Sequence, residues 1–146
     1  MKLKVRVHVI SAFLPVCDMT ENLERHADLH AVLKQWDERS GIRFWECTGR
    51  YGEEFEMGYV VVGLNDEEAL AVANAFRQES VLVVDEQRMS RLIYTDKRPN
   101  LELGVLVSSN TKPVDCDYTY SAVTDAYYYT RGVPHEAEAA AMEEAA

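Results

Sequence analysis

At 146 residues, of which 47% are hydrophobic, the chain is long enough for one domain with its own core and too apolar to be disordered. It carries 25 acidic and 15 basic residues, a net charge of -10, and a surface of this sign repels phosphate backbones. The composition therefore argues against sequence-independent binding to nucleic acid.

The cysteines and the apolar runs indicate where such a protein works. Cys17, Cys47 and Cys116 are an odd number at wide spacing, which is typical of free thiols in a reducing compartment. No apolar run reaches the roughly 20 residues that a transmembrane helix needs, and the N-terminus lacks the apolar segment of a signal peptide. We expect a soluble, cytoplasmic protein with no membrane association.

The first predicted elements are a strand and a long helix. Residues 2–12 alternate between apolar and polar side chains at first, which is typical of a half-buried strand, and Pro15 cannot continue it. Asp18 and Glu21 have the spacing of a capping box. This motif predicts a helix that runs to about Arg39, where a Ser-Gly pair ends it.

The middle of the chain predicts the rest of an α+β domain. Strands are expected over residues 42–48 and 55–64, a second helix begins at the capping box of residues 65–68, and a fourth strand covers residues 80–84. Residues 91–94 are able to pair with that strand. The order β-α-β-β-α-β is typical of a ferredoxin-like fold, an antiparallel sheet with both helices on one face.

The pattern weakens beyond Lys97. Residues 103–107 fit an extra strand, and five tyrosines between residues 118 and 129 fit burial against a neighbouring subunit. The segment 134–146 is rich in alanine and glutamate, so we expect a frayed or disordered tail without chemistry. The predicted organisation is a single domain over residues 1–133 followed by this tail.

Four groups of residues carry most of the functional information. Two are strand ends that pass into a loop able to hold a ligand, and the other two accompany them in the helices and the fourth strand. In chain order they are Val9-Ile10-Ser11-Ala12-Phe13, Asn22-Leu23-Glu24-Arg25-His26, Glu46-Cys47-Thr48-Gly49-Arg50-Tyr51 with the acidic run Gly52-Glu53-Glu54-Phe55-Glu56, and Glu68-Ala69-Leu70-Ala71-Val72-Ala73 with Gln78-Glu79-Ser80-Val81-Leu82-Val83. Over residues 5–94 this set resembles the phage S-adenosylmethionine lyases, anti-restriction enzymes formerly called S-adenosylmethionine hydrolases.

The resemblance implies a specific reaction. The carboxylate of S-adenosylmethionine attacks its own γ-carbon and expels methylthioadenosine, leaving homoserine lactone. Such an enzyme mainly holds a folded conformer, and good intramolecular geometry can contribute roughly 7–11 kcal/mol. A dry pocket favours the reaction because a carboxylate and a sulfonium become neutral products. No cofactor or metal is implied, and loss of the methyl donor would counter host restriction-modification.

The resemblance also implies the catalytic residues. Glu56 is expected to hold the ammonium group of the substrate or to stabilise the sulfonium, and in a hydrolase it would be a general base for water. Tyr51 is expected to donate its hydroxyl to the substrate carboxylate or to Glu56. Without the resemblance, the acids of residues 53–56 fit a solvated turn, and Tyr51 fits an aromatic side chain that covers the core.

The remaining site residues implied by the resemblance bind the substrate. Ser11, Ala12 and Phe13 are expected to line a nucleoside pocket in which Phe13 stacks on adenine. Gln78 and Glu79 are expected to reach the ribose or the amino group. The same segments otherwise fit an ordinary strand end and a loop after a helix.

A metal site is not expected. His26 and His30 lie one helical turn apart, but the residue that follows His26 is not the glutamate that a zinc-protease motif requires, and no third ligand is evident. A structural role for a partly buried histidine fits better. The chain also lacks a glycine-rich phosphate loop and a nucleophile elbow.

The resemblance also bears on the oligomeric state, and the sequence leaves several alternative functions open. Related enzymes form trimers whose active sites lie between subunits, so the resemblance implies a homotrimer. The alternatives are hydrolysis of the same substrate to homoserine, an acidic protein that mimics DNA and blocks a restriction enzyme, and a PII-like ligand sensor. Only the net charge of -10 supports the DNA mimic, and the fold alone does not separate the sensor from the enzyme.

Overall fold

The computed structural model describes residues 5–51, 53–113 and 116–131. The predicted tail over residues 134–146 lies outside the described residues. In chain order the elements are β1 (Val7–Ser11), α1 (Met19–Ser40), β2 (Arg43–Tyr51), β3 (Glu54–Val62), α2 (Asp66–Ala75), β4 (Ser80–Val84), β5 (Met89–Tyr94), β6 (Leu101–Ser109), β7 (Tyr118–Ser121) and β8 (Ala126–Arg131). No helix in the described part is long and apolar enough to cross a membrane.

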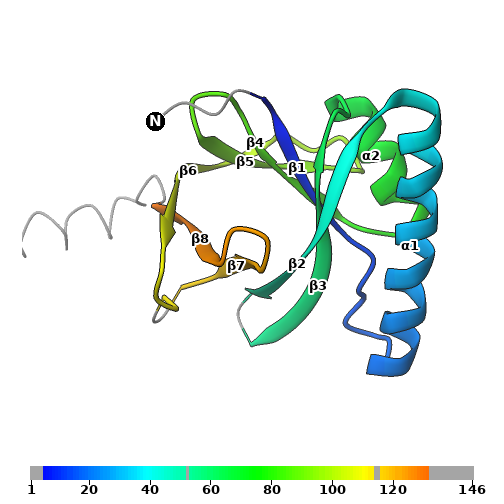
Figure 1. The fold of residues 1–146 in the computed structure, drawn as a ribbon, viewed down its shortest axis with the longest axis horizontal. Helices are drawn as coiled ribbons and strands as arrows, with labels where there is room; N and C mark the ends of the chain where they lie inside the picture. Colours follow the sequence, from blue (N-terminus) through cyan, green and yellow to red (C-terminus); the bar gives the residue numbers. More distant parts are fainter. Residues whose placement is uncertain (1–4, 52, 114–115, 132–146) are drawn as a thin grey trace, which may run out of the picture.

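The eight strands of the described residues form a closed antiparallel barrel, in the order β1-β3-β2-β7-β8-β6-β5-β4 with β4 returning to β1 (Figure 1). The predicted ferredoxin-like sheet is therefore wrong. In that fold β2 and β4 would be open edges, whereas here β7 pairs with β2 and β5 pairs with β4. The segment after Lys97 supplies β6, β7 and β8, and closure gives each of the described strands a neighbour on both sides.

Both helices pack on the same outer side of the barrel (Figure 1). The core lies between them and the outward side chains of the first four strands, such as Ile10 of β1 and Val61 of β3, which are buried against Leu29 and Leu33 of α1. Since side chains alternate along a strand, the next residues of the same strands face the barrel interior. The closed sheet thus has one face for the core and one face for a cavity.

Local sequence signals set the helix boundaries, as predicted. The Asp18 carboxylate accepts a hydrogen bond from the Glu21 amide at 2.8 Å, and Asn65 does the same for Glu68 at 2.8 Å, so both capping boxes form. Gly41 ends α1 in the left-handed conformation, with φ of 68°. These contacts fix where the chain enters and leaves the helical layer.

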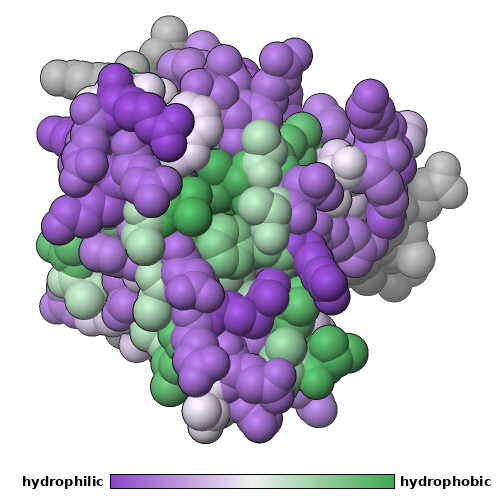
Figure 2. Space-filling model, turned by 90° about the vertical axis from the view of Figure 1, so that its right-hand side faces the viewer, coloured by the Kyte–Doolittle hydropathy of each residue, from purple (hydrophilic) through white to green (hydrophobic). Residues whose placement is uncertain are grey.

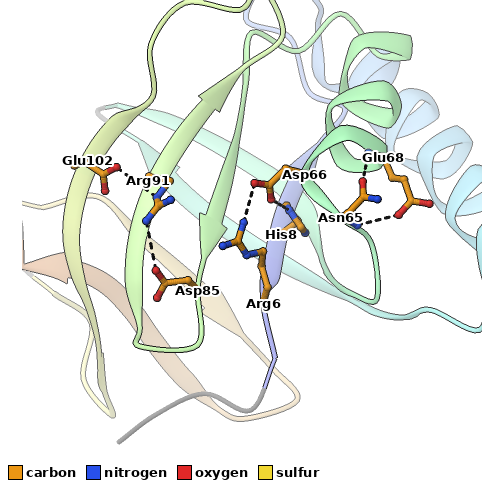
Figure 3. Close-up of polar contacts among 8 residues, drawn as sticks. All are labelled: Arg6, His8, Asn65, Asp66, Glu68, Asp85, Arg91 and Glu102. Carbon is orange, nitrogen blue, oxygen red and sulfur yellow. Dashed lines mark hydrogen bonds and ion pairs between the residues drawn. The ribbon is translucent and has the colours of Figure 1, made fainter.

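A partly buried polar cluster attaches β1 to the start of α2 (Figure 3). The Asp66 carboxylate accepts a hydrogen bond from Arg6 at 2.8 Å and lies 2.8 Å from Nε2 of His8. His8 is fully buried, and burial lowers its pKa although Asp66 opposes this effect. Burial also opposes ionisation of Asp66, but the hydrogen bonds from His8 and Arg6 outweigh it and lower the pKa of Asp66.

This cluster predicts a loss of stability in mild acid. The pKa of His8 is below its usual 6.5, so as the pH falls below about 6.5 the unfolded chain takes up a proton that folded His8 does not. The depressed pKa of Asp66 acts in the same direction only nearer its usual value of 3.8. His8→Gln should therefore flatten the dependence of the unfolding free energy on pH between 8 and 5, measured by urea titration.

The control for this prediction is His30→Gln, which changes an exposed histidine of α1. It should keep the wild-type pH dependence. Parallel curves for the wild type and His8→Gln would show that His8 does not couple folding to pH.

Candidate active site

A cavity of about 700 Å³ occupies the barrel interior. Its wall is polar at one end of the first four strands, where β1 and β2 end and β3 and β4 begin, and becomes apolar along them. The polar or small side chains there are Ser11, Gly49, Tyr51, Glu56, Gly58 and Ser80, and the apolar ones are Val7, Val9, Trp45, Val60, Leu82 and Val84. One cavity therefore offers two chemical environments.

Register brings Tyr51 and Glu56 to the same stretch of wall. Gly49 of β2 pairs with Glu56 of β3, and Tyr51 follows two residues later on the same face of β2. A Cβ on Gly49 would stand 2.5 Å from Cε2 of Tyr51, so the Tyr51 ring lies folded back over the glycine. The Tyr51 hydroxyl is 2.7 Å from Oγ1 of Thr119 on β7, which fixes the ring across the seam between β2 and β7.

The electrostatics of this pair follow from partial burial. Burial raises the pKa of Glu56, and the nearby Glu54 raises it further. In the described part of the chain, no cation or hydrogen-bond donor contacts the Glu56 carboxylate. Burial also raises the pKa of Tyr51, against the opposing hydrogen bond from Thr119. Tyr51 is therefore a neutral hydroxyl, and Glu56 is a carboxylate that a cation would stabilise.

The charged side chains that line the cavity favour a cationic ligand. Among the described residues these are the carboxylates of Glu56, Glu79 and Asp117 and the guanidinium of Arg77. Arg98 pairs with Glu79 at 2.7 Å, so in the described residues the negative potential of the cavity comes chiefly from Glu56, and low-dielectric walls strengthen it.

Two loops form the wall beside Ser11 and Ser80, and two side chains of α1 hold them. Residues 13–15 follow β1 and residues 77–79 precede β4. Asn22 accepts a hydrogen bond from the Leu14 amide at 2.9 Å and donates one to the Leu14 carbonyl at 3.1 Å. Arg25 donates to the Ala12 carbonyl at 2.7 Å and to that of Phe76. The helix motif of residues 22–26 therefore supports the cavity from behind.

Six of the seven residues implied by the resemblance line this cavity: Ser11, Phe13, Tyr51, Glu56, Gln78 and Glu79. Ala12 does not, because its side chain is fully buried in the core beneath the helices. Ser11 donates to the Met57 carbonyl at 2.8 Å, and Gln78 donates to the Phe13 carbonyl at 3.0 Å. Glu79 pairs with Arg98 at 2.7 Å.

The ring of Phe13 is not a free surface. It is 3% exposed, and it meets the rings of His26 and Phe55 edge to face, each with centroids 6.2 Å apart. His26 stacks on Tyr59 at 4.5 Å, and its Nε2 lies 2.9 Å from Glu46. In the described residues no group of three or more potential ligands could hold a metal.

Sequence reasoning did not find Trp45, Cys47, Arg77, Asp117 or Thr119, which also line the cavity. Trp45 and Cys47 are separated from Tyr51 by even numbers of residues along β2, so the three side chains lie on the same face of the strand. The sequence pattern could have predicted this shared face. Thr119 reaches the site only because the barrel closes, and no local pattern indicates that.

Gly49→Ala tests how the tyrosine is positioned. Its Cβ would displace the Tyr51 ring and break the hydrogen bond to Thr119, so the unfolding free energy should fall by about 1 kcal/mol with the fold retained. Thr119→Val removes the same bond, and the double variant should lose little more than the larger single loss. Fully additive losses in denaturant titrations would show that the two residues do not act together.

Comparison with known proteins identifies the family of the chain. Residues 8–131 match the model of the S-Adenosylmethionine lyase family, a span that includes Ser11, Tyr51, Glu56 and Thr119. A search of curated proteins finds no significant match. The family match covers most of the chain and confirms the resemblance seen in the sequence. The chain therefore belongs to the S-adenosylmethionine lyase family, and it is a lyase that acts on S-adenosylmethionine.

Proposed function

We propose that the protein cleaves S-adenosylmethionine inside the barrel by attack of the substrate's own carboxylate. A carboxylate oxygen forms a bond to the γ-carbon while the bond from that carbon to sulfur breaks. The electron pair of the broken bond stays on sulfur. The products are methylthioadenosine and homoserine lactone, and neither water nor proton transfer takes part.

The unpartnered carboxylate of Glu56 carries this proposal. S-adenosylmethionine has an ammonium, a sulfonium and a carboxylate, so it is a net cation that suits a cavity with the Glu56 carboxylate in its wall. Its ammonium group would supply the partner that the described chain does not give Glu56. Fixing the amino-acid end in this way brings the carboxylate towards the γ-carbon, which is the geometric contribution that intramolecular reactions need.

Tyr51 is suited to hold the attacking carboxylate without taking part in proton transfer. Its raised pKa keeps the hydroxyl protonated, and the Thr119 hydroxyl can donate to its oxygen, which leaves the Tyr51 proton for the substrate. The apolar walls exclude water, so the loss of opposite charges in the transition state is favoured.

Product analysis with variants of the acidic turn tests the proposal. In water enriched in oxygen-18, the wild type should give methylthioadenosine and unlabelled homoserine lactone. Glu56→Gln keeps the size of the side chain and removes its charge, so turnover should fall at least about 10²-fold if the charge contributes ~3 kcal/mol. Mass spectrometry measures both the products and the label.

The control is Glu53→Gln in the same turn, since Glu53 is exposed and does not line the cavity. Its turnover should match the wild type, and equal losses in both variants would mean that the turn is structural. Homoserine labelled at its hydroxyl would show hydrolysis at the γ-carbon, whereas later opening of the lactone at its carbonyl labels the carboxyl group.

We also propose that the protein acts as a homotrimer whose subunit contacts lie beside each barrel cavity. Exposed apolar side chains lie close in the chain to residues that line the cavity: Val16, Met19 and Leu23 follow the loop after β1, and Phe55 precedes Glu56. Figure 2 shows that apolar side chains also reach the surface on the helical side of the molecule. Such positions suit burial against another copy of the chain.

Light scattering at the concentration of the turnover assay should give the mass of three chains, each of 16.6 kDa. Leu23→Lys should dissociate the assembly and reduce turnover, because a charge at the contact is costly to bury. Full activity in a monomer would contradict the trimer proposal.

The biological use that we propose is removal of the methyl donor in the host cytoplasm, which protects incoming DNA from restriction systems that require it.

A further inference from the structure

The apolar part of the cavity lies along the strands from Glu56, and the proposed reaction assigns it no contact with the substrate. In its wall Val9 pairs with Val60 and with Leu82, and Val60 pairs with Trp45, so these four side chains form one row across β4, β1, β3 and β2. They are all uncharged and belong to the inner face of the barrel. This row provides an apolar compartment that is continuous with the polar end.

Trp45 is the side chain in that row that could stack on a flat ligand. It lies on the inner face of β2 and lines the cavity, whereas its neighbour Phe44 packs on the opposite face against the core. Among the described residues no other aromatic ring packs against Trp45, in contrast to Phe13, whose ring is enclosed by His26 and Phe55. The expected stacking surface at Phe13 is thus occupied, and the indole of Trp45 offers another one.

The spacing of Trp45 and Glu56 fits the two ends of one ligand. Gly49 pairs with Glu56 and Trp45 pairs with Val60, so the two positions differ by four residues along the β2–β3 ladder. At about 3.4 Å for each residue, this is roughly 14 Å. A nucleoside that carries a short amino-acid chain spans such a length, with its charged end at Glu56 and its flat base in the apolar compartment.

We propose that Trp45 is the stacking surface for the adenine ring of S-adenosylmethionine and of its product methylthioadenosine. This inference rests on the proposed function and deepens it. Indole rings offer large π-faces, and stacking on an aromatic side chain contributes about 1–3 kcal/mol for each base. Trp45 then determines specificity for the base, while Glu56 and Tyr51 act on the amino-acid part.

The chain contains two tryptophans, which allows a clean spectroscopic test. Trp36 lies on α1 and packs against the core outside the barrel, so it is separated from the cavity by the sheet. Trp36→Phe leaves Trp45 as the only tryptophan, and Trp45→Phe leaves Trp36. In each variant we would follow tryptophan fluorescence during titration with methylthioadenosine and, separately, adenosine, which lacks the methylthio group.

Both nucleosides should quench the fluorescence of Trp36→Phe with saturation, and neither should affect Trp45→Phe. Calorimetry should show that Trp45→Phe retains most of the affinity for methylthioadenosine, because a ring remains, while Trp45→Leu loses roughly tenfold or more. Equal quenching of Trp36, or unchanged affinity in Trp45→Leu with an unchanged melting temperature, would overturn the proposal. So would quenching by methylthioadenosine alone.

The same variants separate this inference from the proposed function. Turnover of S-adenosylmethionine without quenching of Trp45 would overturn the stacking role and leave the catalytic proposal intact. Saturable quenching of Trp45 in a protein that gives no lactone would support the nucleoside site while contradicting the proposed reaction.

Discussion

Closure of the sheet is the constraint on which the rest of this structure depends. An open sheet with helices on one face would expose its other face, and a carboxylate there would be solvated. Pairing of β7 with β2 and of β5 with β4 instead turns that face into the wall of a cavity. The inward residues of each strand then meet those of strands far away in the sequence. Glu56, Tyr51 and Trp45 acquire their environments from this closure.

The same closure gives the cavity its electrostatic character. Glu56 sits in a wall whose partial burial raises its pKa, and no cation of the described chain relieves the cost. A bound cation would lower the free-energy cost of keeping Glu56 charged, so the cavity should bind positively charged ligands. The neutral Tyr51, held by Thr119, can contact an anionic group without competing for the cation. Together they match a ligand that carries both charges close to each other.

The helices could be predicted from the sequence because their signals are local. Asp18 and Asn65 begin capping boxes that need only residues three positions away, and Gly41 ends α1 by its own conformation. Barrel closure depends on pairs such as Thr48 with Tyr120, which are distant in sequence and lie where the apolar pattern is weak. The ferredoxin-like interpretation therefore described an element order but not the sheet.

The candidate site, too, could be predicted only in part from the sequence. Glu56 and Tyr51 were identified by resemblance, and the structure places both at the cavity, whereas the environment that perturbs them comes from register and closure. The resemblance also implied that Phe13 stacks on adenine, whereas in the structure its ring meets those of His26 and Phe55 edge to face. Only three-dimensional packing shows which faces of a ring in a cavity wall are covered by other rings.

A crystal structure of Glu56→Gln soaked with S-adenosylmethionine tests the central claim most directly, because slow turnover should preserve the substrate. We expect the amino-acid end of the substrate to lie beside residue 56 inside the barrel, with a carboxylate oxygen behind the γ-carbon in line with its bond to sulfur. Substrate bound outside the barrel, or inside it with the carboxylate turned away from the γ-carbon, would contradict the account.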